Sequence, residues 1–246
     1  MNQYYQNILD FQDQIKFYLD CIFKTYGKEL VLRLEEYNLL QNKYNCIESS
    51  TAIGFILEEF IVSKLEMFTH CDESTKYKID RFDGATSSES FDCFSINDND
   101  CKFLINIKTE KKGSSNNGIA AITQLHKNYC LDDPEQEKSF VLFKILYSIG
   151  EATEDSEKKR AKPRHIHIDG IESYCLEEVD FSKEHKQDNR SWSDIGTGDA
   201  ENAKKKKNSG RLMISREFKE NHKVDESEIS YKNTFEMLQK LIEENK

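Results

Sequence analysis

The chain has 246 residues, a formal net charge of −10 and 33% charged residues, but only 2 prolines and 10 glycines. This length is sufficient for one sizeable hydrophobic core, and the scarcity of proline and glycine argues against several domains joined by long linkers. The sequence contains no run of 18 apolar residues, which excludes a membrane-spanning helix.

The cysteines and the N-terminal stretch both bear on the cellular compartment. Seven cysteines form an odd set without a Cys-x-x-Cys pair, which is typical of free thiols in a reducing environment. The stretch MNQYYQNILDFQDQ lacks the basic start and apolar core of a secretory signal. We therefore expect a cytoplasmic protein that does not associate with membranes.

Basic residues are clustered, although the chain as a whole is acidic. Five lysines and one acid occur from Cys101 to Leu131, and further basic runs occupy residues 158–164 and 204–207. An acidic outer surface around a basic cleft suits a protein that grips DNA in a groove. Solvated loops are the alternative interpretation of the two later runs.

The first 48 residues are expected to form a helical segment for packing or dimerisation, and residues 49–246 a second domain. Apolar residues recur at helical spacing over residues 8–22 and 30–37, with Gly27 between them. A further helix is predicted from a cap at Ser50 or Thr51 to about Phe68. In the polar connector that follows, residues 76–79 are suggested as a short strand.

A β-hairpin is predicted next. Residues 91–96 and 102–109 are rich in aromatic and β-branched side chains, and the intervening Asn-Asp-Asn-Asp at 97–100 is typical of a tight turn. Folding at the centre of this turn pairs residues whose numbers sum to about 197 or 198.

This register brings three polar side chains together at one edge of the sheet. Asp92 lies opposite Ile105 or Asn106 and close to Lys108, because strand side chains alternate between the two faces. A carboxylate, an amide oxygen and an ammonium group are therefore expected to converge.

These residues resemble the signature of the PD-(D/E)xK nuclease superfamily, an acid on one strand followed on the next by an acid, any residue and a lysine. Here the residues are Asp92, thirteen residues of spacer, and Asn106-Ile107-Lys108. The sequence FDCFSI…FLINIKTEKK most resembles that of type II restriction endonucleases of the EcoRV and HincII group. The resemblance covers roughly residues 50–130.

The resemblance implies an α/β (α+β) fold, with a restriction-endonuclease-like central mixed β-sheet flanked by helices and an N-terminal helical arm. It implies Mg²⁺ bound by Asp92, Asn106 and the Ile107 carbonyl, with Lys108 orienting the attacking water or stabilising the phosphate. It also implies a homodimer acting on double-stranded DNA, since a palindromic site has two-fold symmetry.

The resemblance extends to the helix before the hairpin. Gly54-x-x-x-Glu58 is similar to the Gly-x-x-x-Glu helix of many superfamily nucleases, in which the glutamate completes the metal site or binds its water. An ordinary solvent-facing pair of Glu58 and Glu59 is the alternative interpretation.

The sequence departs from the family pattern at Asn106, where the motif has a second carboxylate. Hard divalent cations prefer carboxylates, so the chain is expected to be slow or inactive, whether the asparagine is natural or introduced. A shifted register with Glu110-Lys111-Lys112 as the acid-x-lysine element is the alternative. Asp80 and Asp83 are further substitutes for Asp92, although both look like turn residues.

Small polar and basic residues after the hairpin are predicted to contact DNA. Residues 113–118 form one expected recognition loop, residues 119–129 a helix, and residues 181–210 a loop that resembles the glycine-containing recognition loop of the EcoRV group. A surface helix residue is the alternative for Gln124, and a flexible surface loop is the alternative for the later segment. The predicted DNA-binding residues are Lys111, Lys112, Ser114, Ser115, Asn116, Asn117, Gln124, Lys127, Gly196, Thr197, Gly198, Lys204 and Lys205.

The remaining segments are predicted to be structural. The apolar run at residues 140–149 indicates a buried central strand, and residues 211–214 and 230–244 indicate a strand and a terminal helix. The His-x-His-x-Asp at residues 165–169 is interpreted as a strand with buried isoleucines and outward histidines, because a further histidine needed for a metal motif is missing.

The leading hypothesis is a sequence-specific type II restriction endonuclease that hydrolyses double-stranded DNA with Mg²⁺. The alternatives are a repair or recombination nuclease of the same fold, a non-catalytic DNA-binding relative, and an unrelated α/β interaction protein.

Overall fold

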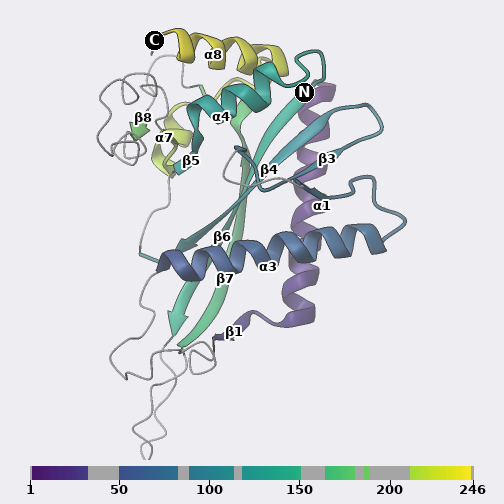
Figure 1. Ribbon diagram of the computed structural model, residues 1–246, viewed down its shortest axis with the longest axis vertical. Coiled ribbons are helices and arrows are strands. Elements are labelled where there is room, and N and C mark those ends of the chain that lie inside the picture. Colours follow the sequence, from purple (N-terminus) through teal and green to yellow (C-terminus); the bar gives the residue numbers. More distant parts are fainter. Residues whose placement is uncertain are drawn as a thin grey trace, which may run out of the picture.

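The computed structural model describes residues 2–32, 50–82, 89–113, 118–150, 164–180, 186–188 and 211–244, which form a mixed α/β fold (Figure 1). The helical elements are α1 (Gln3–Tyr26), α3 (Ser50–Cys71), α4 (Ile122–His126), the π-helix η2 (Lys127–Leu131), the 3₁₀ turn η3 (Leu176–Glu178), α7 (Arg216–Asn221) and α8 (Tyr231–Glu244). The strands are β1 (Glu29–Leu32), β2 (Asp80–Arg81), β3 (Cys93–Ile96), β4 (Lys102–Lys111), β5 (Gly118–Ala121), β6 (Lys138–Gly150), β7 (Arg164–Cys175), β8 (Lys186–Asp188) and β9 (Arg211–Met213).

The described strands form a mixed sheet in the order β1-β7-β6-β4-β3-β2, and a small sheet in the order β5-β9-β8. β4 and β6 are parallel, whereas β3 is antiparallel to β4 and β7 is antiparallel to β6. The predicted hairpin is confirmed, since Cys93 pairs with Ile105 and Ile96 with Lys102. The predicted buried strand is also confirmed as β6, which lies between β4 and β7.

One face of the large sheet is covered by α1 and α3, which cross each other over it (Figure 1). The buried stripe of α1 packs against odd-numbered residues of β4, and the ring of Phe11 stacks on that of Phe103 at 4.1 Å. Ile105 and Ile107 belong to the same core as Leu57 and Ile61 of α3. The N-terminal helix therefore contributes directly to the core of the sheet.

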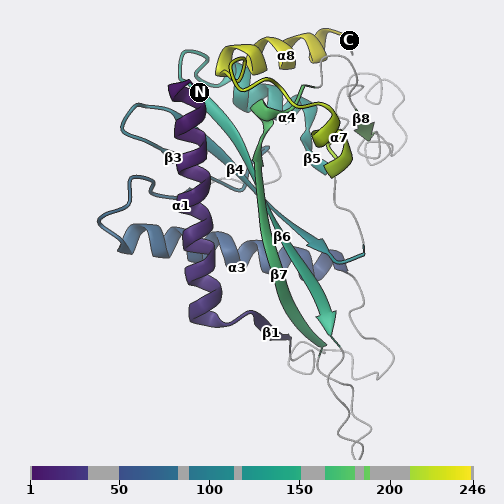
Figure 2. The same cartoon turned by 180° about the vertical axis from the view of Figure 1, so that it is seen from behind.

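The opposite face carries a second core, in which even-numbered strand residues such as Leu104 and Leu142 meet α4, η2, α7 and α8. These helices gather at the end of the molecule where both chain termini lie, and the view from behind in Figure 2 shows the same arrangement. A sheet with cores on both faces requires buried side chains in both directions along its central strands, and this explains the continuous apolar run of β6.

A buried carboxylate links α1 to this arrangement. Glu177, 2% exposed, accepts hydrogen bonds from the Tyr129 hydroxyl at 2.8 Å and the backbone N–H of Phe140 at 3.0 Å. The hydroxyl of Tyr4 donates to the Lys138 carbonyl at 2.6 Å and lies 3.3 Å from Glu177. The burial of Glu177 raises its pKa, while the hydrogen bonds that it accepts favour its charged form.

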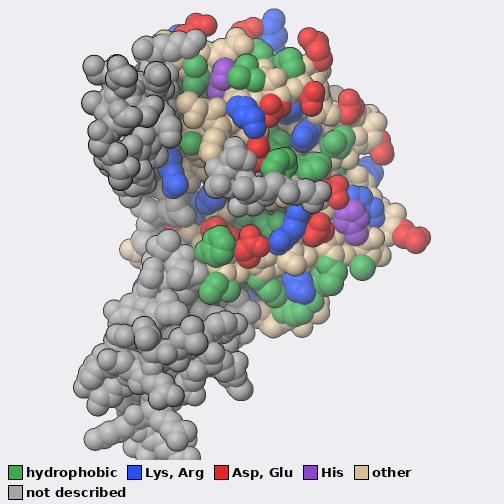
Figure 3. Space-filling model, in the orientation of Figure 1, with side chains coloured by type: hydrophobic (Ala, Val, Ile, Leu, Met, Phe, Trp, Pro, Cys, Tyr) green, Lys and Arg blue, Asp and Glu red, His purple; other side chains and the backbone are tan. Residues whose placement is uncertain are grey.

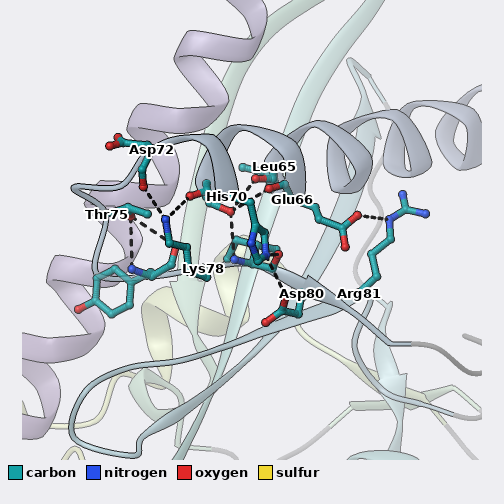
Figure 4. A network of polar contacts seen from close by, with 11 residues as sticks. Leu65, Glu66, His70, Asp72, Thr75, Lys78, Asp80 and Arg81 are labelled. Atoms are coloured by element: carbon teal, nitrogen blue, oxygen red, sulfur yellow. Dashed lines mark hydrogen bonds and ion pairs between the residues drawn. The ribbon is translucent and has the colours of Figure 1, made fainter.

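The C-terminal half of α3 is clamped to the segment that leads into β2 (Figure 4). The Lys78 ammonium donates to the carbonyls of Thr69 and Asp72 at 2.8 and 2.5 Å, which satisfies carbonyl groups at the end of the helix. His70 Nε2 lies 2.9 Å from Asp80 Oδ1. These contacts fix α3 relative to β2, which pairs with β3 at the predicted site.

Three sequence predictions require correction. Leu30 lies in β1, which pairs with β7, and not in a second helix. Residues 118–121 form β5, which pairs with β9, so the predicted helix begins only at Ile122 and continues as η2 to Leu131. The suggested strand at residues 76–79 is instead β2, at Asp80–Arg81. Non-local strand pairing overrides the local pattern in each case.

The other element predictions are confirmed. α3 occupies the predicted helix, β9 the predicted strand near residue 212, and α8 the terminal helix with Leu238 and Leu241 buried. In β7, Ile166 and Ile168 are buried while His167 is exposed, as the alternation predicts.

Candidate active site

The candidate site lies at the N-terminal end of β3. Beyond Ile105, β4 continues without a described strand on that side. Odd-numbered residues of β4 direct their N–H and C=O groups towards the β3 side, as the bond from the Asp92 N–H to the Ile105 carbonyl (2.8 Å) shows. Beyond this bond, the Asp92 carboxylate accepts from the N–H of Ile107 at 2.7 Å. The Glu58 carboxylate accepts from the N–H of Thr109 at 2.9 Å. Two carboxylates thus take the place of the missing strand.

Lys108 is placed between these two carboxylates along the strand. Its ammonium lies 3.9 Å from Asp92 Oδ2, with the Lys108 and Asp92 side chains 21% and 29% exposed. The predicted contact between Asp92 and Lys108 is therefore present, on strands paired in the predicted register. An acid, a cation and a second acid from a helix meet at one partly exposed edge.

Gly54 explains how a helix residue reaches β4. A Cβ atom on Gly54 would lie 2.7 Å from Thr109 Oγ1, which is closer than any normal contact. The absence of a side chain lets α3 approach the strand, and one turn later Glu58 accepts from both the N–H and the hydroxyl of Thr109. The Gly-x-x-x-Glu spacing thus has a direct geometric role.

A small pocket of about 110 Å³ opens beside the two carboxylates. It combines acidic, apolar and basic side chains from α3, β2 and the start of β3. Its lining consists of Phe55, Glu58, Glu59, Val62, Arg81, Phe82 and Asp92.

The electrostatics of the pocket favour a cation. Burial raises the pKa of the Asp92 carboxyl, and the nearby Lys108 ammonium and the Ile107 N–H oppose this rise. Burial likewise raises the pKa of Glu58, again opposed by Lys108, while the charge of Asp92 adds to the rise. Two partly desolvated acids that repel each other are stabilised by any positive charge placed between them.

Asn106 is the weakest part of the predicted site. It is 3% exposed, and its Nδ2 donates to the Ser90 carbonyl at 2.8 Å. Its Oδ1 is buried and has no hydrogen-bond partner in the part of the chain that is described. The amide therefore holds the segment that leads into Asp92, and leaves one oxygen available as a neutral ligand.

The oxygen atoms at the site suit Mg²⁺. Carboxylate and amide oxygens are hard ligands of the kind that Mg²⁺ prefers, and the unpartnered Oδ1 of Asn106 fits such a role. Within the described ranges, no cluster of three or more His, Cys, Asp or Glu side chains is arranged to hold a metal. The residues fit a cation held by few protein ligands, as is usual for Mg²⁺.

The alternative acids lie elsewhere. Glu110 is directed to Lys144 of β6, at 2.9 Å, and Lys112 is exposed in the turn after β4. Asp80 is engaged with His70, and Asp83 lies outside the described residues.

The predicted DNA-binding residues that the structure describes are Lys111, Lys112, Gln124 and Lys127. Lys127 lies 3.1 Å from Glu89 and 3.9 Å from Asp132, which offset its charge. Gln124 is half-buried in α4, and Lys111 is the last residue of β4. The predicted residues Ser114, Ser115, Asn116, Asn117, Gly196, Thr197, Gly198, Lys204 and Lys205 lie outside the described residues.

Among the described residues on one face of the molecule, the basic side chains form no continuous patch. On the face shown in Figure 3, blue and red side chains are interspersed among the coloured residues. Of the predicted loop at 181–210, the structure describes β8, which pairs with β9. No described helix has the length and apolar character needed to cross a membrane.

No protein-family model matches the chain, and a search of curated proteins gives no match either.

Sequence reasoning missed three residues that shape the site. Arg81 donates to the carboxylate and the carbonyl of Glu59 at 3.3 and 3.0 Å and thereby lines the pocket. Thr109 anchors Glu58, and Lys144 binds Glu110. A lysine inside the apolar run of β6 was the visible signal for the last of these.

Proposed function

We propose that the protein is a Mg²⁺-dependent deoxyribonuclease that hydrolyses phosphodiester bonds of double-stranded DNA, in the manner of a type II restriction endonuclease. The observation that carries the proposal is the 3.9 Å contact between Asp92 and Lys108 beside the Glu58 carboxylate. Acids and a lysine at an open sheet edge provide the groups that metal-assisted phosphodiester hydrolysis needs.

The architecture supports the proposal. The resembled nucleases have a mixed sheet flanked by helices, with a helix before the hairpin that carries the acid and the lysine. This chain has a mixed sheet with helices on both faces, and α3 precedes the β3–β4 hairpin. The specific restriction-endonuclease-like fold, and a homodimer that matches a palindromic site, belong to the same proposal.

Each residue has a defined part in the proposed reaction. Asp92 and Glu58 would hold Mg²⁺, with the Ile107 carbonyl and Asn106 Oδ1 as neutral ligands. When bound, the ion supplies positive charge to the phosphate and lowers the pKa of a bound water. The Lys108 ammonium, 3.9 Å from Asp92, orients the water or stabilises negative charge that develops on the phosphate.

Asn106 favours a second candidate, a DNA-binding relative without catalytic activity. One carboxylate fewer weakens metal binding, and the Asn106 amide already has a structural bond to Ser90. A nuclease acting on branched DNA in repair or recombination would use the same site and would differ in its substrate.

A cleavage assay on phage genomic DNA, supercoiled plasmid and a branched duplex, with and without Mg²⁺, tests the proposal. We expect discrete fragments from the linear genome with Mg²⁺ and none with EDTA. Asp92→Asn and Lys108→Met should lower the rate by at least about 10²-fold, because they remove a ligand and a group at the reacting phosphate. Asp20→Asn and Lys232→Met, at exposed positions, serve as matched controls.

The other outcomes distinguish the alternatives. Cutting confined to the branched duplex would identify the repair type of nuclease. If the wild type binds DNA and does not cut it, Asn106→Asp restores the family carboxylate. Persistent inactivity of that variant, once it is shown to be folded, would refute the nuclease proposal and favour the DNA-binding relative.

A further inference from the structure

Three ion pairs follow one another across β3, β4, β6 and β7, next to the proposed catalytic lysine. Lys108 contacts Asp92 at 3.9 Å, Lys144 contacts Glu110 at 2.9 Å, and Arg216 contacts Glu172. β4 and β6 are paired in parallel with Lys108 opposite Lys144, and β7 places Glu172 opposite Lys144.

The two lysines compete for one acid. Residues that face each other on paired strands lie about 4.8 Å apart, and residues two apart on one strand lie on the same face, roughly 7 Å apart. Glu110 is two residues from Lys108 on β4 and diagonal to Lys144. Both ammonium groups can therefore reach its carboxylate.

Burial and distance decide which lysine holds Glu110. The Lys144 and Glu110 side chains are 8% and 18% exposed and lie 2.9 Å apart. The Lys108 and Asp92 side chains are 21% and 29% exposed and lie 3.9 Å apart. A buried charge needs a partner more than an exposed one does, because it has lost its hydration. The more deeply buried pair is also the tighter one.

We propose that Lys144 is a positioning residue, which holds Glu110 and thereby leaves the Lys108 ammonium at Asp92. The inference rests on the proposed function, because it assigns Lys144 a part in keeping the catalytic lysine in place. Without the charge of Lys144, Glu110 would lose its ion pair at 2.9 Å, and the Lys108 ammonium, two residues away on the same strand face, could reach its carboxylate. Lys108 would then turn from the reacting phosphate towards Glu110.

Arg216 completes the arrangement on the other side. Glu172 is the paired neighbour of Lys144 on β7, and its contact with Arg216 leaves Lys144 to Glu110. Each cation in the row thus has its own acid, and the order of the pairs determines where Lys108 points.

The experiment compares four full-length proteins: the wild type, Lys144→Met, Glu110→Gln/Lys144→Met and Lys144→Arg. Lys144→Met should lower the cleavage rate by on the order of 10²-fold, the loss expected when a group at the reacting phosphate is misplaced. The double variant has no competing carboxylate and should recover most of the wild-type rate. Lys144→Arg keeps a cation beside Glu110 and should cut at nearly the wild-type rate.

A second measurement follows Lys108 without DNA or metal. The ¹H–¹⁵N signal of the Lys108 ammonium, assigned with Lys108→Arg, should shift in Lys144→Met and return in the double variant. A merely structural Lys144 predicts a double variant at least as impaired as the single one, and this result would overturn the inference. An unchanged Lys108 signal in folded Lys144→Met would overturn it as well. If no protein cuts DNA, the proposed function fails, and the ammonium signal alone decides whether Lys144 positions Lys108.

Discussion

At the scale of single residues, the site is held together by backbone groups as much as by side chains. The N–H groups of Ile107 and Thr109 have no strand beside them, and they are satisfied by Asp92 and Glu58. Buried backbone donors almost always find a partner, so these two acids have a structural role in addition to any chemical one. Burial raises the pKa of both carboxyls, because their charged forms lose hydration in the folded protein.

Glu58→Gln removes a carboxyl group whose charged form is disfavoured by burial. A carboxyl whose pKa is raised on folding favours the native state below its unfolded pKa, and this contribution is lost as the pH rises through the folded pKa. In the absence of Mg²⁺, the variant should therefore be more stable than the wild type near pH 8, by about 1 kcal/mol or less after allowing for partial exposure. Near pH 3 it should show no gain.

Urea unfolding at both pH values provides the measurement, and Glu73→Gln, at an exposed position, is the control. Equal stability of Glu58→Gln and the wild type near pH 8 would show that Glu58 is not under electrostatic strain. Added Mg²⁺ should stabilise the wild type more than Glu58→Gln, because the variant lacks one of the proposed ligands.

At the scale of secondary-structure elements, the close approach of α3 to β4 determines where Glu58 lies. Gly54 permits the approach, and the clamp between Lys78, Asp80 and the end of α3 fixes the other end of the helix (Figure 4). The helix is thus held at both ends of the stretch that lines the pocket.

Gly54→Ala tests this packing, because two effects of opposite sign compete. Alanine favours a helix over glycine by about 1 kcal/mol, whereas its methyl group would meet Thr109 Oγ1 at 2.7 Å. We expect the clash to dominate and the variant to lose about 1–3 kcal/mol of stability. Thermal unfolding measures the loss, and Ser63→Ala, at an exposed position of α3, should be neutral or stabilising.

The double variant Gly54→Ala/Thr109→Ala removes the clashing hydroxyl. It should be more stable than the sum of the two single changes predicts, because the two residues are in contact. Strict additivity would mean that Gly54 matters for a reason other than its distance from Thr109.

Much of the hairpin was predictable from sequence, because its determinants are local. Asn-Asp-Asn-Asp and the period-two alternation fix the turn and register, and these place Asp92 near Lys108. The contact between Glu110 and Lys144 was not predictable, since it depends on the parallel register between β4 and β6. β1 and β5 were missed for the same reason, because their partners β7 and β9 lie far along the chain.

At the scale of the whole molecule, α1 is part of the same core as the sheet. Phe11 is fully buried and contacts the rings of Phe103, Tyr77 and Phe143. A helix that contributes central rings to a core is expected to unfold together with it.

We therefore expect one cooperative unfolding transition, and a loss of about 3–5 kcal/mol in Phe11→Ala. Phe17→Ala is the matched control from the same helix, because Phe17 is 58% exposed, and it should change stability by less than about 1 kcal/mol. Calorimetry and denaturant titration measure both. A separate early transition for α1 would contradict the shared core.

The contacts of the N-terminal residues with Glu177 and Glu178 also constrain the order in which the protein can fold. The hydroxyl of Tyr5 donates to Glu178, and the hydroxyl of Tyr4 lies close to Glu177. The Asn2 side chain donates to the Ile229 carbonyl at 2.7 Å. During synthesis the first turn of α1 must wait for residues made more than 170 positions later. Until those residues have been made, the apolar stripe of α1 must be kept from other exposed hydrophobic surfaces.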